Sequence, residues 1–75
     1  MSGINDYIKI GKRIKQVRIK SGISQKEMAE RLGISQSGYS NYENEHREPG
    51  INLIYSFCKE FGMTIDELIR MELIE

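Results

Sequence analysis

Apolar side chains recur at helical spacing along most of the chain, and glycine or polar turns separate the apolar stretches. This pattern predicts helices at about residues 6–21, 25–32, 36–44 and 51–61, and a fifth helix opened by Thr64. The side chains expected to face inward are Ile10, Ile14, Val17, Met28, Ala29, Leu32, Tyr39, Tyr42, Ile51, Ile54, Phe57, Cys58, Phe61, Ile65, Leu68 and Ile69. Five helices joined by short turns make an all-α domain.

Three hydroxyl side chains stand where helices are expected to begin. Ser24 and Thr64 are each followed three residues later by a glutamate, Glu27 and Glu67. This spacing predicts two capping boxes, in which the hydroxyl and the carboxylate each accept a backbone N–H at the helix start. Ser35 is placed to cap the helix at residues 36–44.

A single domain suits the 75 residues of the chain. The pattern predicts a flexible lead at residues 1–6, a folded domain at 7–70 and an extension at 71–75. So small a core would gain from oligomerisation. The extension adds Met71, Leu73 and Ile74, which either finish the core or form a dimer contact.

Two short helices joined at Gly33 lie at the centre of the sequence, and the second is polar on its outer side. Gly33 suits the positive φ that often follows a helix. The outer side of the second helix carries hydroxyl and amide groups without charge, from Gln36, Ser37, Ser40 and Asn41. This is the helix-turn-helix arrangement that reads the DNA major groove. Gly38 within that helix indicates either a close approach to DNA or to the preceding helix, or a tolerated change.

Composition narrows the class of protein. One cysteine, Cys58, and one histidine, His46, provide neither a disulfide nor a metal cluster. Neither a catalytic triad nor a glycine-rich phosphate loop is recognisable, so we expect no enzyme and no cofactor. Without an apolar run of membrane-spanning length or a signal-peptide pattern, a cytoplasmic protein is expected.

Charge is unevenly distributed although the formal net charge is zero. Residues 1–31 carry eight basic and three acidic side chains, whereas residues 32–75 carry three basic and eight acidic ones. The first half could therefore face phosphate groups while the second half faces away. The alternative is that these are ordinary solvated charges on helix surfaces.

Three sequence blocks together resemble a known family. They are IGKRIKQVRIKSG, SQKEMAERLGISQSGYSNYE and REPGINLIYSFCKEFGMTIDELI, and they cover most of the chain. In order and spacing, they resemble the Cro/cI-type (Xre-like) helix-turn-helix domain of phage repressors and bacterial regulators. The resemblance implies a compact five-helix, lambda-repressor-like fold.

The resemblance also implies roles for individual residues. Gln36, Ser37 and Asn41 would read base edges, and an ion pair between Arg18 and Glu43 would tie the first helix to the third. Gln25 would contact a phosphate and brace Gln36. The candidate phosphate contacts are Gln25, Lys26, Ser40, Asn44, Arg47, Lys12 and Arg13, and the candidate dimer contacts are Tyr55, Met71, Leu73 and Ile74.

The chain departs from the family pattern in the turn after the third helix. Relatives usually have glycine where this chain has Glu45, and we expect Asn44 to supply the positive φ instead. Glu45 and Glu48 also make this loop less basic than usual, which leaves Arg47 as its main phosphate contact.

These observations predict a DNA-binding transcriptional regulator, a repressor, that binds a palindromic double-stranded operator as a homodimer. The alternative is a protein-interaction module, antitoxin-like or anti-repressor, that keeps the fold and binds another protein. The zero net charge and the acidic loop favour this second class slightly.

Overall fold

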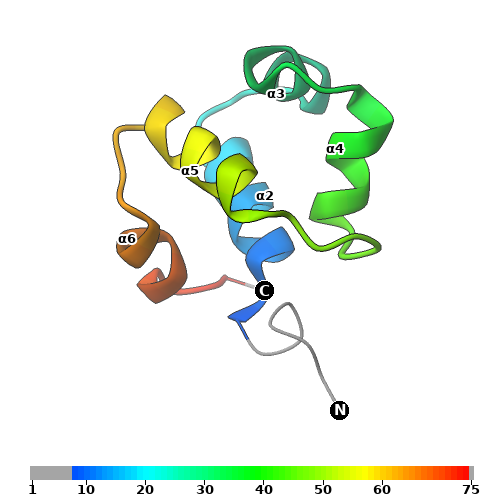
Figure 1. Ribbon diagram of the computed structural model, residues 1–75. Coiled ribbons are helices and arrows are strands. Elements are labelled where there is room, and N and C mark those ends of the chain that lie inside the picture. Colours follow the sequence, from blue (N-terminus) through cyan, green and yellow to red (C-terminus); the bar gives the residue numbers. More distant parts are fainter. Residues whose placement is uncertain (1–7, 75) are drawn as a thin grey trace.

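Five helices connected by short turns account for most of the residues that the computed structural model describes, which are 8–74 (Figure 1). The helices are α2 (Ile10–Lys20), α3 (Gln25–Leu32), α4 (Gln36–Glu43), α5 (Ile51–Glu60) and α6 (Ile65–Arg70). No strand occurs among residues 8–74, as the hydrophobic pattern predicts. The predicted flexible lead at residues 1–6 lies outside this range. None of the described helices is long and apolar enough to cross a membrane.

The first predicted helix begins later than expected. Lys9 has φ 60° and lies in the left-handed region, so α2 starts at Ile10. The start predicted at Asp6 or Tyr7 lies outside the described residues. A helix cannot continue through a residue in that conformation. At the other end, Gly22 takes φ 71° and stops the helix as predicted.

The predicted caps are present, with one correction. Ser35 Oγ accepts the N–H of Gly38, and Thr64 and Glu67 form the full reciprocal capping box. Ser24 Oγ accepts the N–H of Glu27 at 3.0 Å. The Glu27 carboxylate does not reach back, however, because it accepts from Arg31 at 2.6 Å one helical turn later.

The turn after α4 takes its left-handed residue from an unexpected position. Glu45 has φ 60°, whereas Asn44 has φ −83°, so the prediction for Asn44 is wrong. The N–H of His46 donates to the carbonyl of Asn41, and the N–H of Glu45 donates to that of Tyr42. This is a Schellman motif, in which the residue after the cap must be left-handed. The motif therefore imposes about 1–2 kcal/mol of strain on Glu45.

The core lies where the five helices converge. Its fully buried side chains are Ile14, Met28, Tyr39, Phe57, Cys58 and Leu68. In Figure 1, α2 passes behind α5, with α4 at one edge of the molecule and α6 at the other, and α2 packs against both α4 and α6. One prediction is corrected, because Ile51 is 64% exposed and does not face inward. Met71 packs against the core, which is one of the two alternatives that the sequence left open.

Close contact between α2 and α4 depends on a missing side chain. A Cβ on Gly11 would overlap the carbonyl oxygen of Tyr42 and come within 3.2 Å of the carbonyl oxygen of Glu43. Only glycine allows the N-terminal turn of α2 to pack directly against the backbone at the end of α4. Gly11 thus sets how α4 sits on the rest of the domain.

Candidate nucleic-acid interface

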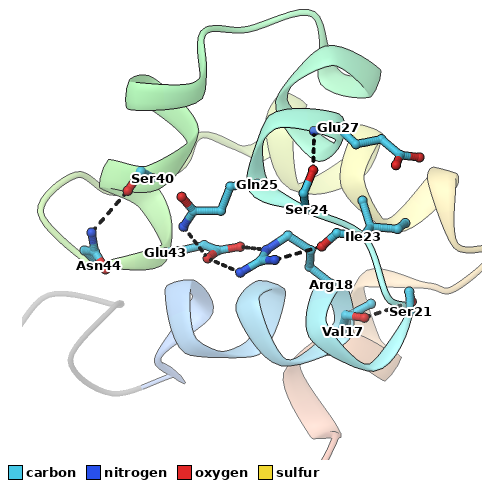
Figure 2. Close-up of polar contacts among 10 residues, drawn as sticks. All are labelled: Val17, Arg18, Ser21, Ile23, Ser24, Gln25, Glu27, Ser40, Glu43 and Asn44. Atoms are coloured by element: carbon cyan, nitrogen blue, oxygen red, sulfur yellow. Dashed lines mark hydrogen bonds and ion pairs between the residues drawn. The ribbon is translucent and has the colours of Figure 1, made fainter.

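The outer face of α4 presents the residues that the sequence assigned to base reading. Gln36, Ser37 and Asn41 are exposed, and their side chains make no hydrogen bond to any described residue. Ser40 is half-buried beside them, and its hydroxyl accepts from Asn44 Nδ2 at 3.2 Å (Figure 2). The face therefore carries amide and hydroxyl groups, without charge, that are available to a ligand.

Gly38 lies within the same helix, and the structure does not support the idea that it allows a close approach to α3. The nearest atom to a Cβ placed there would be Ser35 Oγ, at 3.0 Å, which belongs to the cap of α4 itself.

The inner side of α4 is anchored by a buried ion pair. Arg18 Nε donates to Glu43 Oε2 at 2.6 Å, and Arg18 Nη2 donates to Glu43 Oε1 at 3.1 Å. Figure 2 shows Arg18 pointing from α2 between α3 and α4 to reach this carboxylate. The Glu43 side chain is completely buried, and that of Arg18 is nearly so. The pair that the family resemblance implies is thus part of this structure.

Two further contacts extend the pair to α3. Gln25 Nε2 donates to Glu43 Oε1 at 2.9 Å, and Arg18 Nη1 donates to the carbonyl of Ile23 at 2.8 Å (Figure 2). Gln25, at the start of α3, therefore braces Glu43 through its amide nitrogen, where the resemblance implied Gln36. Through these four bonds, one carboxylate and one guanidinium fix the relative positions of α2, α3 and α4.

This buried environment shifts the pKa values of Glu43, Arg18 and Tyr39. Burial acts to raise the pKa of the Glu43 carboxyl, but hydrogen bonds to Arg18 and Gln25 outweigh it, and the pKa is lowered. The hydrogen bond to Glu43 raises the pKa of Arg18. Burial, reinforced by Glu43, raises the pKa of Tyr39, whose hydroxyl has no hydrogen-bond partner of normal geometry. The Arg18–Glu43 pair is therefore charged at neutral pH.

Cationic side chains flank α4 at two places. Lys26 is exposed in the first turn of α3, next to Gln25. Arg47 is exposed in the loop after α4, where its guanidinium lies 5.9 Å from the ring centre of Tyr42. This cation–π contact keeps Arg47 near the C-terminal end of α4.

The other two predicted phosphate contacts lie elsewhere. Arg13 donates from Nε to the carbonyl of Ile8 at 2.6 Å, and from Nη1 to the carbonyls of Met71 and Leu68. Its donors thus join α2 to the end of α6, so its assignment to phosphate is corrected. Lys12 lines a groove between α2 and the segment 71–74.

The four predicted dimer residues do not form one surface. Tyr55 is exposed on α5, with Lys59 Nζ 5.8 Å from its ring centre. Met71 packs against the core, whereas Leu73 and Ile74 border the groove beside α2. No group of three or more potential metal ligands occurs among residues 8–74.

Sequence reasoning missed two residues that hold elements of the domain together. Gly11 lies inside a predicted helix, where glycine lowers helix stability. A glycine at such a position could have indicated close packing against another element. Gln16 holds the segment 71–74 through two backbone contacts. Nothing local in the sequence marks that role.

Comparisons with known proteins identify the family to which this arrangement of helices belongs. A family model described as helix-turn-helix matches residues 14–68. The HTH-type transcriptional regulator ImmR of Bacillus subtilis (strain 168) is 37% identical over 60 residues, which are 80% of this chain and 47% of ImmR. This chain therefore spans about half the length of that relative.

Two solved structures share the fold. The DNA-binding domain of the P22 c2 repressor has a TM-score of 0.76 and 26% identity, over 87% of this chain and 86% of that one. SinR, a master regulator for biofilm formation solved in complex with DNA, has a TM-score of 0.72 and 31% identity, over 80% of this chain and 97% of that one. These likenesses confirm the five-helix, lambda-repressor-like fold that the sequence predicts.

Proposed function

This chain belongs to the helix-turn-helix family, and on that basis we propose that it is a sequence-specific, double-stranded DNA-binding transcriptional regulator that acts in the cytoplasm as a repressor. The observation that supports this best is the arrangement of α4. Its outer face presents exposed Gln36, Ser37 and Asn41, while its inner face is fixed to the domain by the buried Arg18–Glu43 pair. Reading a base sequence requires free donors and acceptors on a rigid element.

In the proposed complex, α4 enters the major groove. The amides of Gln36 and Asn41 each offer a donor and an acceptor, which matches the N6 and N7 edge of adenine. Ser37 supplies a hydroxyl that can serve either role. Because none of these side chains has a partner among the described residues, base contacts would break no bond inside the domain.

Phosphate contacts would set the position of α4. The candidates are Gln25, Lys26, Ser40, Asn44, Arg47 and, from α2, Lys12. Gln25 is the most informative of these, because its amide nitrogen already holds Glu43. A phosphate bound at the start of α3 would therefore be linked through one side chain to the residue that anchors α4, and the N-terminal end of a helix favours anions.

We propose a homodimer on a palindromic operator, because one domain of this size reads only a short half-site. Half-sites would lie about 34–36 Å apart, one turn of DNA. In-vitro selection of bound duplexes reports the half-site, its symmetry and its spacing together. Enrichment of a two-fold symmetric sequence with that spacing supports the proposal. Selection that enriches no sequence after repeated rounds contradicts it.

A second function, a protein-interaction module of the antitoxin or anti-repressor kind, is favoured by one feature. Glu45 and Glu48 lie in the loop after α4, where negative charge opposes approach to a phosphate backbone. Fluorescence anisotropy with a random-sequence duplex at low salt separates the two functions. Binding there, weakening as salt is added, supports DNA binding, whereas no binding at low salt supports the interaction module.

A further inference from the structure

A groove of about 420 Å³ runs between the outer side of α2 and the segment 71–74, away from the core. One wall is formed by Lys12, Lys15, Ile19 and Lys20 on α2, and the other by Leu73 and Ile74. Of these residues, only Lys12 is also a candidate phosphate contact of the proposed DNA interface.

The second wall is held in place by Gln16. Its Nε2 donates to the carbonyl of Glu72 at 2.7 Å, and the N–H of Ile74 donates to its Oε1 at 2.7 Å. These two bonds lie on either side of Leu73 and fix the backbone of the segment against α2. Ile74 is thereby fixed at the edge of the groove and does not fold into it.

Large apolar side chains stand exposed on both walls. Ile19 is 56% exposed and Ile74 is 67% exposed. Both residues line the groove. Covering this surface would remove apolar area from water, which favours association.

Opposite charges lie on the two sides of the groove. Lys15 and Lys20 line its α2 side. Glu72 is exposed and directly precedes Leu73 and Ile74, which line the other side. None of the three forms an ion pair with another described residue. A two-fold axis through such a surface brings the lysines of one copy onto the glutamate of the other, so the surface is complementary to itself. The zero net charge of the chain adds no long-range repulsion between copies.

We propose that two copies of this chain associate through this groove, with Ile74 of each copy inserted into the groove of the other and Lys15 and Lys20 facing the other copy's Glu72. This inference rests on the proposed dimeric regulator and locates its contact. The contact lies on α2 and the segment 71–74, and Tyr55 and Met71 take no part in it.

Sedimentation equilibrium without DNA tests the apolar part of the contact. The wild-type chain should form a dimer, and Ile74→Asp should weaken the dimer Kd by about tenfold or more. The matched control is Tyr55→Asp, which places the same charge on the exposed apolar residue of α5 and should leave the Kd unchanged. Circular dichroism should show that both variants remain folded, because both side chains are exposed. A wild-type chain that stays monomeric, or a dimer broken by Tyr55→Asp but not by Ile74→Asp, overturns the proposal.

A mixing experiment tests the orientation. The double variant Lys15→Glu, Lys20→Glu and the single variant Glu72→Lys each place like charges on both sides of the groove, so each alone should be mainly monomeric. An equimolar mixture should recover the dimer, because every contact then joins opposite charges. Recovery is also a control for folding, and its absence overturns the proposed pairing.

Binding to a random-sequence duplex is measured separately. A dimer that binds no DNA contradicts the proposed function but supports this dimer contact. A monomer that binds DNA supports DNA binding but contradicts this dimer contact.

Discussion

The carboxylate of Glu43, at the last residue of α4, is bound by the guanidinium of Arg18 in the last turn of α2, with contacts of 2.6 and 3.1 Å. The two residues are 25 positions apart in the chain, and the Glu43 side chain has no exposed surface. A buried pair of this kind contributes little net stability when intact, but breaking it leaves an uncompensated charge. The orientation of α4 therefore depends on both partners being present.

Removing one partner should destabilise the domain strongly. Arg18→Met is expected to lower the free energy of unfolding by about 3–5 kcal/mol, because Glu43 remains charged and buried. Urea unfolding followed by circular dichroism measures the change. The control is Arg31→Met, which breaks an exposed pair with Glu27 and should cost less than about 1 kcal/mol. Equal losses of unfolding free energy in the two variants would mean that the buried pair matters no more to stability than the exposed one.

The same pair should make stability depend on acid. The folded state lowers the pKa of Glu43 below its ordinary value of 4.5. The stability that this shift provides is present above the unfolded pKa and is lost as pH falls through the folded pKa. Unfolding midpoints measured from pH 7 downward should therefore fall once the pH drops below about 4.5. In Glu43→Gln the decline should be shallower, and an unchanged slope in that variant would assign the acid sensitivity to other carboxyl groups.

Base reading should be separable from stability. Gln36→Ala and Asn41→Ala each remove an exposed amide, so neither should change the unfolding midpoint appreciably. Each should weaken binding to the selected operator by about 1–3 kcal/mol and leave binding to random duplex unchanged. Anisotropy titrations with both duplexes provide the comparison. A uniform loss on both would indicate phosphate contacts in place of base contacts.

Loss of a phosphate contact should weaken binding to the selected operator and to random duplex alike. Lys26→Ala is expected to weaken binding to every duplex by a similar factor and to reduce the slope of log K against log salt by about 1. Lys59→Ala removes the same charge from α5 and is the control, since it should leave the slope unaltered. If the two variants behave alike, Lys26 acts only through net charge.

Close packing at Gly11 should matter more than its side-chain change suggests. In Gly11→Ala the new methyl group would meet the carbonyl oxygens of Tyr42 and Glu43, and overpacking of this kind costs about 1–3 kcal/mol. We expect lower stability and a larger loss of operator binding than of random-duplex binding, because α4 must move. Gly50→Ala, which has open space around its Cβ position, is the matched control. A Gly11→Ala protein as stable as the wild type would show that the contact is adaptable.

Features governed by nearby residues were predictable from the sequence. The cap at Ser35 and the box at Thr64 and Glu67 depend on atoms three residues apart, and both form as expected. The exposed face of α4 followed in the same way from periodicity. Ile51 was misplaced because it is the first residue of α5, where a side chain tilts back toward the preceding loop.

Features set by distant backbone were not predictable. Arg13 reaches carbonyl groups 55 and 58 positions away, and a carbonyl gives no sequence signal. At Glu45 the Schellman hydrogen bonds impose the left-handed conformation whatever the side chain prefers. In both cases the tertiary arrangement overrides the intrinsic preference of the residue.

The side chains of Gln36, Ser37 and Asn41 form no hydrogen bond inside the domain, whereas the side chain of Glu43 holds three helices together. In the proposed complex, target preference and folding are therefore encoded by different side chains of the same short helix. Descendants of this chain could acquire new operators through single substitutions that selection for stability would not oppose. The same separation makes α4 a suitable place to substitute the corresponding exposed residues of a related helix-turn-helix regulator.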